Sequence, residues 1–318
     1  MENITTTTTQ QNIDDRHLVF TGKGGKFFGI WVVNILLTII TLGLYYPWAK
    51  IAIRKFIWNE TSLKNDRFVF HGKGIEIFKG FLIIYALLII FIVFINYYPQ
   101  GILLFYLIVA AVVPLAIFGG WRYRVSKTSW RGIYFSFDGN FTEFLKIYFT
   151  GLLFLILTFG LYSSWFRVKI MKYLFKHTRL GQYRFSFSGH GDELFGINLL
   201  GSLFSILTLY IYIPWYMKNR FNFTVNNTVI HHNDKQSKLR STLNGSQLFG
   251  VLLVNILIII FTLGIGFPWT RMRYYKILFE NIHIPKDVNL DELEQNKIEN
   301  NDATGDSLLD FLDVGIDF

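Results

Sequence analysis

Five long stretches of the chain contain no Asp, Glu, Lys or Arg, and short charged stretches separate them. The charge-free windows are residues 27–49, 80–121, 147–166, 194–217 and 241–270. At about 1.5 Å per residue, each is long enough for a helix that crosses a hydrocarbon core of about 30 Å. A soluble helix of this length normally carries charge on its outer face. The pattern therefore predicts an integral membrane protein.

The second window is long enough to cross a membrane twice. Its middle, residues 96–101, is polar and contains Pro99 and Gly101, which favour a turn between the apolar segments 81–95 and 102–118. We therefore expect about six apolar helical segments. The predicted fold class is a membrane all-α protein with internal repeats and small β-hairpin elements at the membrane surface.

One phrase recurs at the end of an apolar window: Thr-Leu-Gly-Leu-Tyr-Tyr-Pro-Trp at 41–48 returns as Thr-Leu-Gly-Ile-Gly-Phe-Pro-Trp at 262–269. The copy at 158–165 lacks the proline, and the copy at 208–215 lacks the glycine. Gly and Pro loosen or end a helix, and Tyr and Trp favour the headgroup level of a bilayer. The phrase therefore predicts a helix exit with aromatic membrane anchors. The candidate anchors are Tyr45, Trp48, Trp165, Trp215 and Trp269.

Polar residues inside the apolar windows suggest a second interpretation of this phrase. Asn34 and Asn255 precede the Trp of their own copies by the same spacing, and Thr38, Thr41 and Thr262 lie nearby. Helices broken by Gly or Pro line the polar binding sites of transporters. A buried amide can equally bond a neighbouring helix. These five residues are the candidate intramembrane polar site.

A second recurring phrase, aromatic-x-Phe-x-Gly, lies between the apolar windows. It occurs at 68–72, 135–139 and 185–189, and an acidic residue and a Phe follow each copy. Apolar side chains that alternate along a short segment ending at glycine are typical of a strand with one buried face. We expect these strands to pair into a small sheet at the membrane surface.

The positive-inside tendency conflicts with six alternating spans. Simple alternation places the loop 167–193 on the opposite side from the loops 50–79, 122–146 and 218–240, although all four are basic. An alternative is that some Gly- or Pro-broken segments enter the membrane and return, so that every strand-forming loop shares the cytoplasmic face.

The distribution of charge divides the chain into three parts. Residues 1–16 form a Thr-rich terminus that we expect to be disordered, and 17–285 form the repeated membrane domain. Residues 286–318 carry 10 acidic and 2 basic residues and are predicted to be a disordered tail, whereas the rest of the chain has a net charge of +17. The basic loops are expected to meet anionic lipid headgroups rather than nucleic acid.

The end of the acidic tail alternates apolar and acidic side chains, which is typical of a docking peptide for a protein partner. The candidate docking residues are Leu308, Leu309, Phe311, Leu312 and Phe318. The sequence also leaves open a homo-oligomer.

Residues for catalysis are not evident. The chain has no cysteine, its seven histidines show no metal-ligand spacing, and the apolar windows hold no ionisable side chain of the kind that proton-coupled pumps use. We therefore predict no catalytic, cofactor-binding or metal-binding residues, and a protein that is not an enzyme.

The order of strand phrase, Asn-containing apolar helix, Thr-Leu-Gly-x-Tyr-x-Pro-Trp and basic helix resembles the YjgN-like family of bacterial inner-membrane proteins, a domain of unknown function. The resemblance covers roughly residues 18–284, and the third copy departs from the phrase at Ser163 and Ser164. It implies a multi-pass protein of the bacterial cytoplasmic (inner) membrane and supplies no catalytic residues.

Two functions follow from these patterns. The first is transport or permeation of a small solute through the broken helices, which rests on the repeats and the intramembrane Asn and Thr residues. The alternative is a membrane scaffold that presents a basic cytoplasmic face and an acidic docking tail to proteins or lipids.

Overall fold

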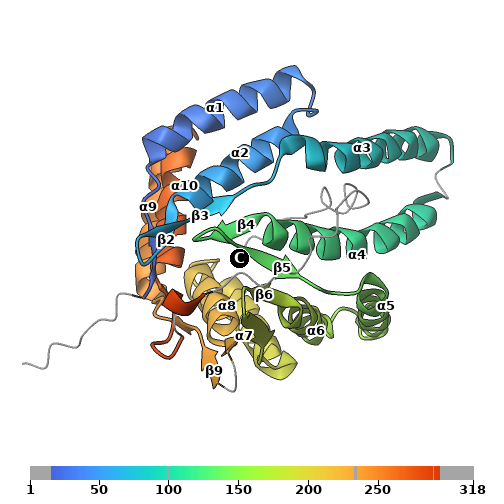
Figure 1. Cartoon of the computed structure of the whole chain (residues 1–318). Coiled ribbons are helices and arrows are strands. Elements are labelled where there is room, and N and C mark those ends of the chain that lie inside the picture. The colour runs from blue at the N-terminus through green and yellow to red at the C-terminus, as the bar shows by residue number, and fades with distance from the viewer. Residues whose placement is uncertain (1–15, 99–100, 233–234, 289, 294–318) are drawn as a thin grey trace, which may run out of the picture.

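Five helical hairpins surround a nine-stranded and a two-stranded antiparallel sheet in the computed structural model, which describes residues 16–98, 101–232, 235–288 and 290–293 (Figure 1). The helices of this described part are α1 (Gly24–Ile40), α2 (Tyr46–Asn59), α3 (Gly74–Tyr97), α4 (Ile102–Ser126), α5 (Phe141–Leu157), α6 (Ser163–Lys176), α7 (Gly191–Leu207), α8 (Ile213–Asn226), α9 (Gly245–Phe261) and α10 (Phe267–Phe279). Neighbouring hairpins pack through α2 and α3, α4 and α5, α6 and α7, α8 and α9, and α10 and α1, so that the last hairpin meets the first.

The first nine strands form a meander in chain order. The strands of the described residues are β1 (Leu18–Phe20), β2 (Thr61–Leu63), β3 (Asp66–Phe70), β4 (Thr128–Trp130), β5 (Ile133–Phe137), β6 (Thr178–Leu180), β7 (Tyr183–Phe187), β8 (Thr228–His232), β9 (Lys235–Lys238), β10 (Arg240–Ser241) and β11 (Ile282–His283). Strands β1 to β9 make one antiparallel sheet, and β10 pairs with β11. His283 also bridges to His17 immediately before β1, which closes the circle. The strands predicted from the aromatic-x-Phe-x-Gly phrase are confirmed as β3, β5 and β7.

A backbone hydrogen bond repeats once in every hairpin and shows that the unit occurs five times within the described residues. A residue between the incoming strand and the first helix of each hairpin donates its N–H to a carbonyl at the end of the second helix. The donor and acceptor pairs are Thr21–Glu60 (2.9 Å), His71–Lys127 (2.8 Å), Asp138–His177 (3.1 Å), Ser188–Asn227 (2.9 Å) and Thr242–Asn281 (3.1 Å).

The second unit lacks a recognisable copy of the Thr-Leu-Gly-x-Tyr-x-Pro-Trp phrase, which lies at the tip of each of the other four hairpins and is called the tip phrase below. Pro114 lies within α4, as far before Thr128 in the sequence as Pro47 lies before Thr61. The pair α3–α4 is therefore the same hairpin with both helices lengthened at the tip. Figure 1 shows this pair projecting beyond its neighbours.

The six expected apolar segments correspond to α1, α3, α4, α5, α7 and α9, and in the four windows outside α3–α4 the chain reverses within the window. Among the described residues, two helical stretches, Gly74–Tyr97 and Ile108–Ser126, are long and apolar enough to cross a membrane. Strands β6 and β7 from the loop 167–193 pair with β5 and β8. The strand-bearing loops therefore lie on one side of the molecule, as the alternative of returning segments predicted.

At each reversal the backbone makes a left-handed turn, and its first residue carries an apolar side chain that gives no turn signal in the sequence. Leu42 and Gly43 have φ values of 51° and 91°, and the N–H of Gly43 donates to the carbonyl of Thr38 at 2.7 Å. This is the bonding pattern of a helix that ends in a left-handed glycine. The other tips repeat it at Phe159–Gly160, Leu209–Tyr210 and Leu263–Gly264.

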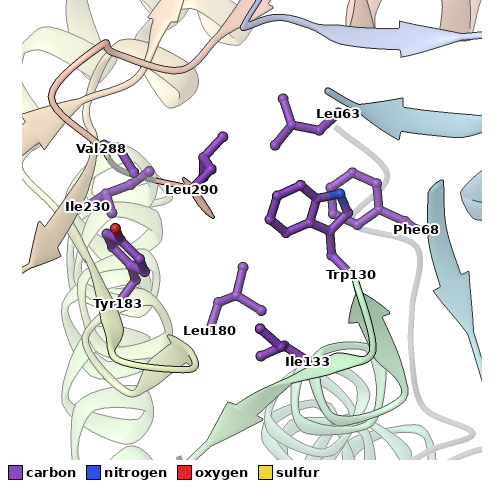
Figure 2. Packing of buried hydrophobic residues seen from close by; sticks show 9 residues of the cluster. All are labelled: Leu63, Phe68, Trp130, Ile133, Leu180, Tyr183, Ile230, Val288 and Leu290. Carbon is purple, nitrogen blue, oxygen red and sulfur yellow. The ribbon is translucent and has the colours of Figure 1, made fainter. Parts of the chain in front are cut away.

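The central core lies inside the ring of strands (Figure 2). The two-residue turns of the β4–β5 and β6–β7 hairpins place one inward apolar residue on each side of the turn, Trp130 with Ile133 and Leu180 with Tyr183. The buried cluster comprises Leu63, Phe68, Trp130, Ile133, Leu180, Tyr183, Ile230, Val288 and Leu290. Val288 and Leu290 of this cluster lie after the predicted boundary at residue 285.

Candidate functional surfaces

The two candidate asparagines lie inside separate hairpins rather than around a shared cavity. Asn34 on α1 donates from Nδ2 to the carbonyl of Ile30 at 2.6 Å, and Asn255 on α9 donates to the carbonyl of Thr270 on α10 at 3.1 Å. Both side chains are buried, and each Oδ1 lacks a hydrogen-bond partner within the described part of the chain. The amide of Asn255 therefore ties the two helices of its own hairpin together.

The positions equivalent to these asparagines explain their role in packing. Gly151 and Gly201 stand at the same spacing before Trp165 and Trp215. A Cβ at Gly151 would lie 2.1 Å from Phe166, and one at Gly201 would lie 2.1 Å from Tyr216. The hairpins that carry Asn have Ala49 and Thr270 in the places of these two rings. A small residue on one helix thus accompanies a large one on the other.

The candidate threonines make hydrogen bonds at the helix ends that form the tips. Oγ1 of Thr41 accepts from the N–H of Tyr45 at 3.0 Å and donates to the carbonyl of Leu37 at 2.7 Å. Thr262 makes the equivalent bonds with Gly266 and Ile258, and Thr38 donates to the carbonyl of Asn34 at 2.6 Å. Thr158 and Thr208 cap their tips in the same way, although the sequence analysis did not single them out.

The tryptophans of the tip phrase pack across the joints between hairpins. Each indole ring covers the glycine that begins the next hairpin, a contact that the sequence analysis missed. The pairs are Trp48–Gly74, Trp165–Gly191, Trp215–Gly245 and Trp269–Gly24. At the last joint, a Cβ on Gly24 would lie 2.3 Å from Cδ1 of Trp269. Tyr45 stacks on Trp48 with ring centroids 5.8 Å apart, and the role of these rings as membrane anchors stays a prediction.

The turns of the tips form an exposed apolar surface. The exposed fractions of the left-handed residues are 81% for Leu42, 98% for Phe159, 84% for Leu209 and 92% for Leu263. Exposed apolar side chains continue from the tips along α1, α5, α7 and α9 and over most of α3. Apolar surface of this extent is typical of an interaction site.

The C-terminal strap, residues 284–288 and 290–293, crosses the centre of the ring and is held by cations. Arg16 donates to the carbonyls of Lys286 and Val288 at 2.6 and 3.0 Å. Arg131 donates to the carbonyl of Leu290 at 3.1 Å. Hydrogen bonds from Lys64 and Arg131 lower the pKa of Asp291 to about 2. The candidate docking residues from Leu308 to Phe318 lie outside the described residues, as do residues 1–15.

A family described as "Bacterial protein of unknown function (DUF898)" matches residues 15–182 and 216–311. The chain belongs to this family. The matched part runs through the strap, which agrees with its place in the body. The gap between the matched parts begins at β7 and ends in the first turn of α8, so it includes the tip that lacks glycine.

Curated relatives of this DUF898 protein carry the name inner membrane protein YjgN. The protein of Salmonella typhimurium (strain LT2) is 38% identical over 123 residues, which are 38% of this chain and 31% of that protein. The protein of Escherichia coli (strain K12) is 30% identical over 137 residues, which are 42% of this chain and 34% of that protein. The alignments thus span about a third of these relatives. No solved structure matches the chain.

These names confirm the predicted location in the bacterial inner membrane and the predicted family. They assign no activity to the DUF898 protein.

Proposed function

We propose that this DUF898 protein is a non-enzymatic membrane scaffold whose apolar tips and long α3–α4 hairpin insert into the inner membrane. The observation that carries the proposal is the antiparallel pairing that gathers the strand-bearing loops of the hairpins into a nine-stranded sheet and a two-stranded sheet linked to it by the His17–His283 bridge. The pair α3–α4 anchors the ring, and the shorter hairpins enter the bilayer and return. The sheet then forms a rigid cytoplasmic platform for proteins or lipids.

The interior of the ring supports a scaffold better than a solute path. The centre of the sheet is filled by nine buried apolar residues, including Trp130 at 1% exposure. The candidate polar residues form hydrogen bonds within their own hairpins. Thr262 lines the hollow beside the last hairpin, and the other four candidates are absent from its lining. Transport, the first hypothesis from the sequence, has no comparable observation in its favour.

The charge distribution supports a cytoplasmic position for the platform. The body of the chain is strongly basic, and most of its cations lie on the second helix of the hairpins and on the strands. The turn between α3 and α4 carries no charge. Loops rich in Lys and Arg stay on the cytoplasmic side of bacterial membranes.

Single-cysteine labelling tests this arrangement, since the chain has no cysteine of its own. We would introduce cysteine separately at the exposed positions Asn65, Asn96, His190 and Ser246, and treat intact cells with a membrane-impermeant maleimide. The expected result is labelling at Asn96 alone, with the other three positions labelled only after permeabilisation. Labelling of His190 together with Asn96 in intact cells would restore six alternating spans and overturn the proposal.

A further inference from the structure

One joint of the ring contains an apolar slot, between the last hairpin and the first. Its volume is about 520 Å³, and its lining is mostly apolar. The lining includes Ile258, Gly266, Trp269, Met272, Arg273 and Lys276. The slot therefore lies at the place where Trp269 covers Gly24 and closes the ring.

The slot has an identifiable origin in the repeat. The residue three positions before the tip Trp is tyrosine in three hairpins, and its ring stacks on that Trp. The pairs are Tyr45–Trp48, Tyr162–Trp165 and Tyr212–Trp215, with ring centroids 5.8, 6.0 and 5.9 Å apart. In the last hairpin this position is Gly266. The ring of Trp269 therefore lacks the stacked tyrosine, and the space next to it is open.

Glycine at this position also leaves Arg273 without the tyrosine ring that its counterpart Lys169 contacts in the third hairpin. Lys169, four residues after Trp165, lies with Nζ 5.3 Å from the centroid of the Tyr162 ring. Arg273 occupies the same position after Trp269, and glycine stands where that ring would be. Lys276 lies one helical turn further on and makes a long ion pair of 3.9 Å with Glu280. Two mostly exposed cations thus stand at the edge of an apolar slot.

A second hollow of about 580 Å³ shares Arg273 and Lys276 with the slot. Its lining is more polar and includes Ser246, Gln247 and Asn281, together with the carboxylate of Glu280. Apolar surface on one side of the two cations and hydroxyl and amide groups on the other match the order of groups in a glycerophospholipid.

We propose that this joint binds one anionic glycerophospholipid, with an acyl chain in the slot and the phosphate on Arg273 and Lys276. The guanidinium of Arg273 can pair with two phosphate oxygens, and Lys276 adds a second positive charge. The headgroup hydroxyls meet the polar hollow, where Glu280 disfavours any headgroup with a second anionic group. This inference rests on the proposed insertion of the tips, which brings acyl chains to the slot.

The decisive variant fills the slot with the two side chains that the first hairpin has at the equivalent positions. Ile258→Leu combined with Gly266→Tyr reproduces the pair Leu37 and Tyr45, and the first change is needed because a Cβ at Gly266 would lie 2.4 Å from Ile258. We would add phosphatidylglycerol or phosphatidylcholine to the full-length protein in mild detergent and count retained lipids by native mass spectrometry. The wild type should retain one phosphatidylglycerol, and the double variant should lose about tenfold or more of this affinity.

Two further variants separate the contribution of the headgroup to lipid binding from that of the acyl chain. Arg273→Gln with Lys276→Gln should remove the preference for phosphatidylglycerol over phosphatidylcholine. Lys169→Gln, at the equivalent position over an intact tyrosine, should leave lipid retention unchanged. These surface changes do not enter the core, so they remain informative if the filled variant fails to fold.

Retention of phosphatidylglycerol by the filled variant at the level of the wild type would overturn the proposal. Competition by inorganic phosphate as strong as that by the lipid would also overturn it, because the acyl chain would then contribute nothing. The cysteine labelling pattern is independent of the slot. Loss of the lipid site with labelling at Asn96 alone would therefore leave the scaffold proposal intact.

Discussion

At the scale of single residues, the tips are governed by backbone conformation. Gly43 has φ 91°, and a Cβ built on it meets nothing within 4 Å, so any effect of a side chain there comes from the backbone. Tyr210 holds the equivalent position with φ 69°. A non-glycine residue in this region costs about 1–2 kcal/mol.

We therefore expect opposite effects at the two tips. Gly43→Ala should lower the free energy of unfolding by about 1 kcal/mol, and Tyr210→Gly should raise it by up to about 1 kcal/mol. Thermal unfolding in detergent, followed by tryptophan fluorescence, measures both. Gly29→Ala is the control, because Gly29 lies within α1 with open space around its Cβ, and helix propensity there favours alanine. Equal effects of alanine at positions 29 and 43 would contradict the account of the tips.

At the scale of secondary-structure elements, the ring closes where α10 meets α1. A Cβ on Gly24 would lie 2.3 Å from Cδ1 and 2.9 Å from the backbone Cα of Trp269, whereas a Cβ on the adjacent Gly25 meets nothing within 4 Å. Gly24→Ala must therefore separate α1 from α10, at a cost of about 1–3 kcal/mol. Gly25→Ala should be neutral or slightly stabilising. A melting temperature that is the same for both variants would show that this contact does not hold the ring closed.

The elements also show what could be predicted from the sequence. The strands β3, β5 and β7 followed from alternating aromatics, and four of the five repeats followed from the tip phrase. The reversal at Leu42 was one of two alternatives that the sequence left open, because an apolar window has the same composition whether the chain crosses or returns. The second repeat was hidden because only Pro114 survives from its phrase.

The candidate site was predicted less well than the elements. Asn34 and Asn255 were correctly placed in apolar helices, but their role depends on the residue opposite, and that residue lies on the returning helix. The glycines under the tryptophans were missed for a similar reason. Trp269 and Gly24 are far apart in the chain, and only closure of the ring brings them together.

At the scale of the whole molecule, the C-terminal strap connects parts of the ring that are distant in sequence. Arg16 precedes the first strand, and Lys64 and Arg131 belong to the turns of two different β-hairpins. All three hold the strap over the central apolar cluster. Within the strap, Asp291 is the carboxylate that binds both Lys64 and Arg131.

The contribution of Asp291 should depend on pH with a defined sign. Its pKa is lowered to about 2 in the folded protein, compared with about 3.9 in an unfolded chain. A lowered pKa stabilises the fold fully above about pH 4, and this stabilisation is lost as the pH falls towards 2. Asp291→Asn should therefore melt at a lower temperature than the wild type at pH 7, and this difference should shrink below pH 4. The difference should also shrink in high salt, because the ion pairs of Asp291 are exposed. A difference that persists unchanged at pH 2 would mean that the strap is held by its backbone contacts and by Val288 and Leu290, and not by the charge of Asp291.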